Sequence, residues 1–182
     1  MVAFKDMWYG HPINHSIMTP CIADREFKNL EGRLIRPGYP VYANQCAIRM
    51  SIALRRAGVR ANQLKGCTSC GAHAHSEMHF INSSQLASSI TRANLPGVGK
   101  MERITGSRVE DYYPQLFGRT GIIHIRDYWQ RSTDASGNPT GDHIDVWNGY
   151  RSSAKWLLEW FSWLGYYSNY ANGSEIWFWE VK

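Results

Sequence analysis

The sequence predicts an α+β domain in which helices come first and a small antiparallel sheet follows. Three observations carry this prediction: an amphipathic segment in the first third of the chain, two strand-like segments joined by a polar turn, and an apolar, aromatic final segment. The 182 residues contain no internal repeat and no low-complexity linker. We therefore expect a single domain spanning residues 1–182.

The segment Cys46–Ala57 is the strongest helix prediction in the chain. Ala47, Met50 and Leu54 recur at intervals of three and four residues and form one apolar stripe. Gly58 follows at the position where glycine commonly ends a helix. This pattern predicts a helix that begins at a cysteine and buries one face.

Two further segments are predicted as strands of an antiparallel hairpin. Gly121–Arg126 is apolar and β-branched, and His143–Trp147 alternates polar and apolar residues. A long polar turn at 130–141 joins them. The remaining expectations are irregular structure at 4–42, a helix at Ser83–Ala93, a mixed segment at 106–117, a helix at Lys155–Leu164 and a strand at Ile176–Val181.

The formal net charge of +5 permits an anionic partner without identifying one. No stripe of basic and aromatic residues resembles a nucleic-acid module, so no nucleic-acid partner is expected. No apolar run approaches the length of a bilayer span, and no membrane partner is expected. The segment Met1–Met7 lacks the charged start and apolar stretch of a secretory signal, which favours the cytoplasm or export by a machine that reads no such signal. The densest basic group falls largely on the predicted solvent face of the first helix: Arg49, Arg55, Arg56 and Arg60.

Cys46 is the candidate nucleophile because it opens the strongest helix, with Asn44 before it as a candidate N-cap. The unsatisfied N–H groups and the positive end of the helix dipole stabilise a thiolate there. The same N–H groups can hold the oxyanion of a tetrahedral intermediate. The competing interpretation is a small buried apolar residue, which suits an arbitrary cysteine.

His143 and Asp145 are the candidate base and its partner. Side chains alternate along a strand, so these two share one face of the predicted strand. An imidazole beside a carboxylate could serve as base to a thiol on a packed helix. The competing interpretation is a hairpin with polar residues facing solvent. His124, on the preceding strand, is an alternative base.

Cys67 and Cys70 are followed by His73, His75 and His79, a set of residues that could bind zinc. The spacing is poor, because zinc sites usually place the second ligand pair on another element. A disulfide between Cys67 and Cys70, or free thiols, is preferred, and no metal is assigned.

Four segments in this order and spacing resemble the fourth family of type VI secretion amidase effectors. They are Tyr42–Gly58, Gly121–Ile123, Asp127–Trp129 and Thr140–Gly149. The likeness runs from about residue 42 to residue 149, and the segment 67–79 looks like an insertion or a divergent loop. It implies a papain-like (NlpC-type) fold with the N-terminal helices packed on a small antiparallel sheet.

The resemblance also implies a function. Such enzymes hydrolyse the amide between γ-D-glutamate and meso-diaminopimelate in peptidoglycan, after injection into the periplasm of a rival cell by a contractile apparatus. A cognate immunity protein, typically a dimer, protects the producer. Carried over by motif, Cys46 is the nucleophile and His143 the base. Independently of the resemblance, we expect the N–H of Cys46 and a nearby donor from Gln45 to hold the oxyanion. No cofactor is implied.

The third catalytic member departs from the family pattern, which places an acid roughly a dozen residues beyond the histidine. No Asp or Glu lies between Val146 and Leu158 in this chain. Asp145 is therefore the preferred partner of the imidazole, with Ser152, Ser153 or a backbone carbonyl as alternatives. The role needs only an acceptor that fixes the tautomer and orientation of the ring.

Two other functions compete with the amidase. The first is a non-catalytic binding module stabilised by zinc at Cys67, Cys70, His73 and His75. That set leaves out Cys21, for which the pattern shows no partner. The second is a papain-like protease that acts on ordinary proteins.

Overall fold

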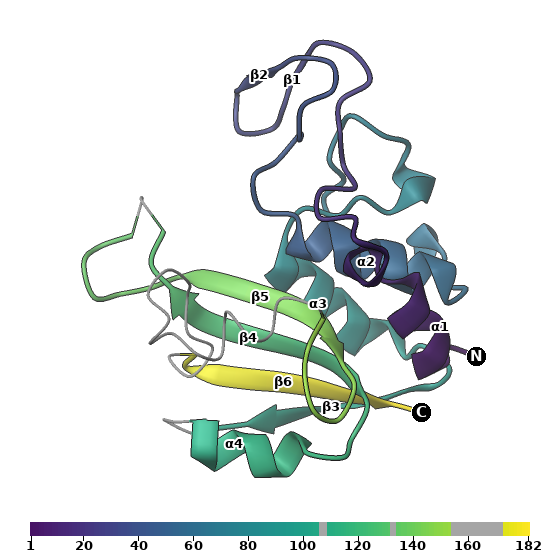
Figure 1. The fold of residues 1–182 in the computed structure, drawn as a ribbon, viewed down its shortest axis with the longest axis vertical. Helices are drawn as coiled ribbons and strands as arrows, with labels where there is room; N and C mark the ends of the chain where they lie inside the picture. The colour runs from purple at the N-terminus through teal and green to yellow at the C-terminus, as the bar shows by residue number, and fades with distance from the viewer. Residues whose placement is uncertain (106–108, 132–133, 154–172) are drawn as a thin grey trace.

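The computed structural model describes residues 1–105, 109–131, 134–153 and 173–182 (Figure 1). Its main feature is a four-stranded antiparallel sheet with the strand order β3–β6–β4–β5. The strands are β3 (Val98–Ile104), β4 (Gly121–Trp129), β5 (Gly141–Trp147) and β6 (Glu175–Val181). The hairpin β4–β5 and the final strand confirm three sequence predictions, whereas β3 was not predicted. The predicted helix at 155–164 lies outside the described residues.

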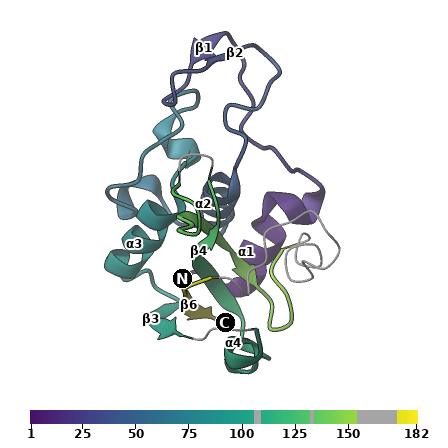
Figure 2. The same ribbon diagram turned by 90° about the vertical axis from the view of Figure 1, so that its left-hand side faces the viewer.

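Three helices cover one face of the sheet and a fourth lies at the other (Figures 1 and 2). The first face packs on α1 (Phe4–Gly10), α2 (Cys46–Arg56) and α3 (Ser83–Ala93), and the second receives the end of α4 (Val109–Leu116). A two-stranded ribbon, β1 (Phe27–Lys28) with β2 (Leu34–Ile35), projects from the body. Short 3-10 turns occupy Pro12–His15, Ala61–Gln63 and His75–Glu77. The structure therefore has the predicted α+β class, with α1 in a segment that was expected to be irregular.

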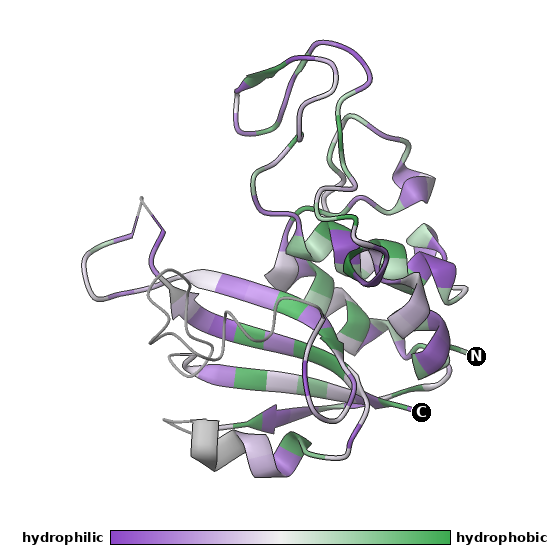
Figure 3. Ribbon diagram, in the orientation of Figure 1, coloured by the Kyte–Doolittle hydropathy of each residue, from purple (hydrophilic) through white to green (hydrophobic). Residues whose placement is uncertain are grey.

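The apolar stripe of α2 packs into the larger of two sheet-facing cores, and hydrophobic positions gather on the facing surfaces of α2, α3 and the strands (Figure 3). Met50 and Leu54 are fully buried against Ile144 and Val146 of β5. The second core lies on the opposite face of the sheet and includes Trp147. Because both faces of β5 are covered, all its residues are buried, including the polar ones.

The helix α2 is buried on more sides than its amphipathic pattern predicts. Arg49 was expected to face solvent, but its side chain is buried and donates a hydrogen bond to the carbonyl of Met18 at 2.8 Å. Arg56 likewise donates to the carbonyl of Gly10 at 2.9 Å. The N-terminal segment wraps the polar side of the helix, and a pattern within the helix cannot reveal such a wrap.

Within the part of the chain that the structure describes, no helix is both long and apolar enough to cross a bilayer.

Candidate active site

Cys46 is the first residue of α2, and its side chain faces strand β5. Its thiol lies beside the imidazole of His143, which acts to lower the pKa of the thiol. Its backbone N–H donates to Oδ1 of Asn44 at 3.2 Å, but the N-cap position belongs to Gln45, one residue after the predicted capping residue Asn44. The helix thus delivers the predicted nucleophile directly to the predicted base.

His143 and Asp145 lie on one face of β5, as their spacing predicted. Nε2 of His143 is 3.4 Å from Oδ2 of Asp145. The ring of Tyr128 meets the imidazole edge-on, with 6.2 Å between ring centroids and 77° between planes. These contacts hold the imidazole between the thiol and the carboxylate.

The carboxylate of Asp145 is buried and surrounded by donors. Oδ2 accepts from Ser153 through Oγ at 2.6 Å and through the backbone N–H at 3.2 Å, and Oδ1 accepts from the N–H of Val146 at 2.8 Å. Burial alone would raise the pKa of Asp145, but His11 and His143 outweigh it and hold the pKa well below its usual range. The surroundings of Asp145 therefore favour its anionic form beside the imidazole.

The same balance acts on Cys46. Burial would raise the pKa of the thiol, because a charged thiolate loses its hydration. The neighbouring imidazole of His143 and the charge of Arg49 act in the opposite direction, and the pKa of Cys46 is lowered on balance. The buried Arg49, which the helix pattern assigned to solvent, therefore contributes to the site.

His11 is part of this site, although no pattern in the sequence indicates a role for it. Its Nε2 lies 3.4 Å from Oδ1 of Asp145, on the other side of the carboxylate from His143. Burial lowers the pKa of His11 to about 4, against the attraction of Asp145. His11 follows α1 in a loop-rich segment, and no spacing within the chain connects it with β5. Only the packing of α1 on α2 could have revealed it.

Neither Ser153 nor Ser152, the two serines considered as alternatives to Asp145, forms a hydrogen bond with His143 in the described part of the chain. Ser153 holds the carboxylate of Asp145 rather than the imidazole. Ser152 is buried, and its Oγ has no hydrogen-bond partner among the described residues. The geometry thus favours Asp145 over both serines as the partner of His143.

The side-chain amide of Gln45 is not free to donate to an oxyanion in this arrangement. Its Nε2 donates to the carbonyls of Cys21 at 2.9 Å and Tyr42 at 3.1 Å, and its Oε1 accepts from the N–H of Cys21 at 2.8 Å. Both amide hydrogens are therefore engaged in holding the chain before α2. The side chain of Gln45 points into the protein and is therefore not the donor that we expected at the oxyanion.

His124 lies on the opposite face of the sheet from His143, and it is not among the groups that act on the Cys46 thiol, which removes it as an alternative base. It pairs across the hairpin with Ile144, so the two share a face. Its Nε2 is 3.9 Å from Oδ2 of Asp142, which also accepts from the hydroxyl of Ser84. Burial lowers the pKa of His124 to about 4, with Asp142 acting in the opposite direction.

Of the two states expected for Cys67 and Cys70, a disulfide or free thiols, the structure has free thiols. Cys67 lies with its Sγ 3.7 Å from the carbonyl of Gln85. Cys70 is buried, and its Sγ lies next to Cys21 and His73 rather than next to Cys67. The two sulfurs are thus turned to different partners.

A cysteine at the start of a helix, packed against an antiparallel sheet that carries its histidine, defines a papain-like fold of the NlpC type. Solved structures with this fold are similar to the whole chain. The effector Tae4 of Salmonella typhimurium, solved in complex with the immunity protein Tai4 of Enterobacter cloacae, matches at a TM-score of 0.57 and 15% identity, covering 100% of this chain and 99% of the other. Tae4 of Enterobacter cloacae matches at a TM-score of 0.55 and 15% identity, covering 100% and 98%.

The family of the chain is established by a match to a protein-family model, because the solved structures above are too distant in sequence to show it. The model of type VI secretion system (T6SS) amidase effector protein 4, Tae4, matches residues 42–179. The chain belongs to this family of amidase effectors, which confirms the resemblance found in the sequence. No curated protein matches the chain.

The buried His124 predicts that the fold loses stability in acid. The folded pKa of about 4 lies below the reference value of 6.5, so between these values the unfolded chain binds a proton that the folded chain does not. Stability therefore falls as the pH drops through this window, by about 3 kcal/mol from this group. Urea unfolding of the wild type and of His124→Gln, near neutral pH and near pH 4, measures the effect.

The comparison uses the pH-dependent loss, not the absolute stability of either protein. The variant should lose about 3 kcal/mol less than the wild type between the two pH values. His11 remains in both proteins and cancels in the comparison. An equal loss in the two proteins would show that protonation of His124 does not contribute.

Proposed function

We propose that this amidase effector hydrolyses the γ-D-glutamyl–meso-diaminopimelate amide of peptidoglycan stem peptides, with Cys46 as nucleophile and His143 as base. The observation that carries the proposal is that the thiol at the start of α2 lies beside the imidazole on β5, which lowers its pKa. Membership of the Tae4 family supports the amidase activity, and the papain-like fold supports thiol chemistry. The bond that is cut and the roles of the residues are the proposed parts.

The first step is a proton transfer within the pair. Because Nε2 of His143 faces Asp145, Nδ1 is the nitrogen left to take the thiol proton. The thiolate of Cys46 then attacks the amide carbonyl of the γ-D-glutamyl residue. Asp145 stabilises the imidazolium and fixes the ring, which makes it a positioning residue.

The amino end of α2 is suited to hold the oxyanion. The N–H of Cys46 now donates to Oδ1 of Asn44, an oxygen that stands where a developing oxyanion would lie. Asn44 is exposed, so its carboxamide can turn and offer its NH₂ group together with the freed N–H of Cys46. We therefore assign the second donor to Asn44 in place of Gln45.

Breakdown of the intermediate returns the proton. His143 protonates the amine of meso-diaminopimelate as the C–N bond breaks, which leaves a thioester between Cys46 and the γ-D-glutamyl group. His143 then takes a proton from water, whose oxygen attacks the thioester and releases a carboxylate. The thiol is regenerated.

The biological setting of the chain is proposed by extension from the family. As a type VI secretion effector, it would be delivered by the contractile apparatus and act on peptidoglycan in the periplasm of a target cell. Tae4 of Salmonella typhimurium has been solved with the immunity protein Tai4. We propose that a cognate immunity protein, expected as a dimer, protects the producer of this chain.

Digestion of purified diaminopimelate-type peptidoglycan tests the proposed bond and nucleophile. The wild type should release fragments with a new γ-D-glutamyl carboxylate and a new meso-diaminopimelate amine, identified by mass spectrometry. Cys46→Ala should release none, because it lacks the sulfur that forms the thioester. Cys67→Ala is the matched control and should keep full activity, since Cys67 lies near Gln85 and away from His143.

Other termini would contradict the proposed bond, and full activity of Cys46→Ala would contradict the proposed nucleophile. Cleavage of ordinary proteins with no change in peptidoglycan would favour the papain-like protease instead. Circular dichroism of each variant separates a chemical loss from a folding defect.

Substitutions of Asp145 test its positioning role through the split between kcat and KM. Asp145→Asn keeps an oxygen that can accept from Nε2 of His143, and papain-like enzymes use Asn in this role. Asp145→Ala removes the acceptor and should lower kcat roughly 10²- to 10⁴-fold with little change in KM. The Asn variant should retain more activity than the Ala variant. Equal kcat values in wild type and Asp145→Ala would exclude the role.

A further inference from the structure

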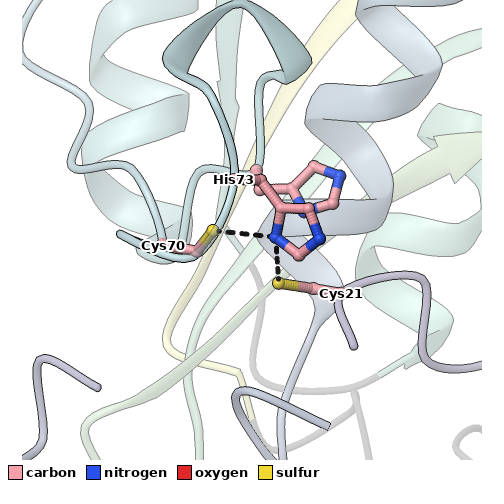
Figure 4. A group of neighbouring side chains, drawn as sticks. Cys21, Cys70 and His73 are labelled. Carbon is pink, nitrogen blue, oxygen red and sulfur yellow. Dashed lines mark hydrogen bonds between the residues drawn. The ribbon is translucent and has the colours of Figure 1, made fainter. Parts of the chain in front are cut away.

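Two thiols and two imidazoles meet outside the candidate active site. One potential ligand atom from each of Cys21, Cys70, His73 and His79 lies within 4.8 Å of the others. Nδ1 of His73 is 3.5 Å from Sγ of Cys21 and 3.4 Å from Sγ of Cys70, and both sulfurs point toward this nitrogen (Figure 4). The ring of His79 lies beside that of His73, with 4.3 Å between centroids.

We propose that these four residues form a structural zinc site. Zinc–sulfur bonds of about 2.3 Å and zinc–nitrogen bonds of about 2.0–2.1 Å at tetrahedral angles separate a sulfur from a nitrogen ligand by about 3.6 Å. The two measured S···N distances, 3.4 and 3.5 Å, lie close to that separation. Two cysteines and two histidines are also a common ligand set of structural zinc sites.

Burial of the cluster supports a bound cation. Cys21 and Cys70 are fully buried, and His79 is nearly so. Nδ1 of His79 is buried and has no hydrogen-bond partner in the described ranges of the chain. Two thiolates balance the charge of one Zn²⁺, so the loaded site is neutral and compatible with burial. Loading releases the two thiol protons to solvent.

The backbone already holds three of the ligands in place. The N–H of Cys70 donates to the carbonyl of His79 at 2.8 Å, and Ser69 and Phe80 form a β-bridge beside them. Cys21 is held from the other side by the side chain of Gln45. Little reorganisation is therefore needed when the ion binds.

The ligand set differs from the one that the sequence spacing offered. Cys67 and His75 are outside the cluster: Cys67 faces Gln85, and His75 packs near Phe80 with 5.5 Å between ring centroids. Cys21, from a distant segment, and His79 take their places. The second element that a zinc site usually requires is thus supplied by the fold.

The site also bears on the candidate active site without taking part in its chemistry. Four protein ligands complete a tetrahedral site and leave no position for substrate, as in structural zinc sites. Cys21 is bound by Gln45, the residue immediately before Cys46. Zinc therefore anchors the chain that leads into α2 and fixes the start of the helix.

Zinc loading of the full chain tests the proposal directly and does not depend on the amidase activity. The protein is purified under reducing conditions, stripped with EDTA, reloaded with zinc chloride, freed of excess metal and measured by mass spectrometry for metal content. The wild type should hold about one zinc ion per chain. Cys21→Ser and His79→Gln should hold zinc at least about 10-fold more weakly against a competing chelator.

Cys67→Ser and His75→Gln are the matched controls and should bind as the wild type does. Cobalt loading provides a second measurement on the unsubstituted chain, where thiolate charge-transfer and tetrahedral d–d bands are expected even if a variant fails to fold. Stripping should also lower the Tm of the wild type by roughly 5 °C or more. Uptake of no zinc, equal affinity in Cys21→Ser, or a Cys21–Cys70 disulfide in place of metal would overturn the proposal.

Discussion

The contact between the amino end of α2 and strand β5 is the constraint on which the rest of the site depends. The helix α2 begins at Cys46, and strand β5 carries His143, which lies beside the sulfur of Cys46. The contact exists because the apolar stripe of α2 packs on the inner residues of β5. A slip of one residue in the β4–β5 register would turn His143 away from the thiol, since side chains alternate along a strand.

The electrostatics of the site follow from this packing. Burial makes each charge costly, so the charges occur as neighbours that offset one another. The carboxylate of Asp145 accepts hydrogen bonds from the hydroxyl of Ser153 and the N–H of Val146, and it faces the imidazole of His143. The negative charge of Asp145 favours an imidazolium at His143. That imidazolium and Arg49 in turn favour a thiolate at Cys46. The chain of partners runs from a loop after β5 to the start of α2.

The periodic segments of the fold could be predicted from the sequence, and the contacts between distant segments could not. Three local patterns were visible in the sequence: the apolar stripe of α2, the alternating polar and apolar residues of β5, and the polar turn before β5. They correctly predicted the helix, the hairpin and the shared face of His143 and Asp145. By contrast, β3 lacks a strong local pattern and is fixed by pairing with β6.

The same limit applies to single residues. His11, Arg49 and Cys21 each gain a partner from another part of the chain, and spacing along the sequence cannot show this. Gln45 was assigned from its position beside the nucleophile, but its side chain turns inward to bind Cys21 and thereby joins the two clusters of reactive side chains.

The pH dependence of Cys46 alkylation by iodoacetamide, resolved by peptide mass spectrometry, tests the central contact most directly. Cys46 is expected to react with an apparent pKa below the ordinary thiol value in the wild type and with a higher apparent pKa in His143→Gln. Cys67 is the internal reference, because burial raises its pKa and it does not contact His143. The same apparent pKa for Cys46 in both proteins would contradict a thiol controlled by this imidazole.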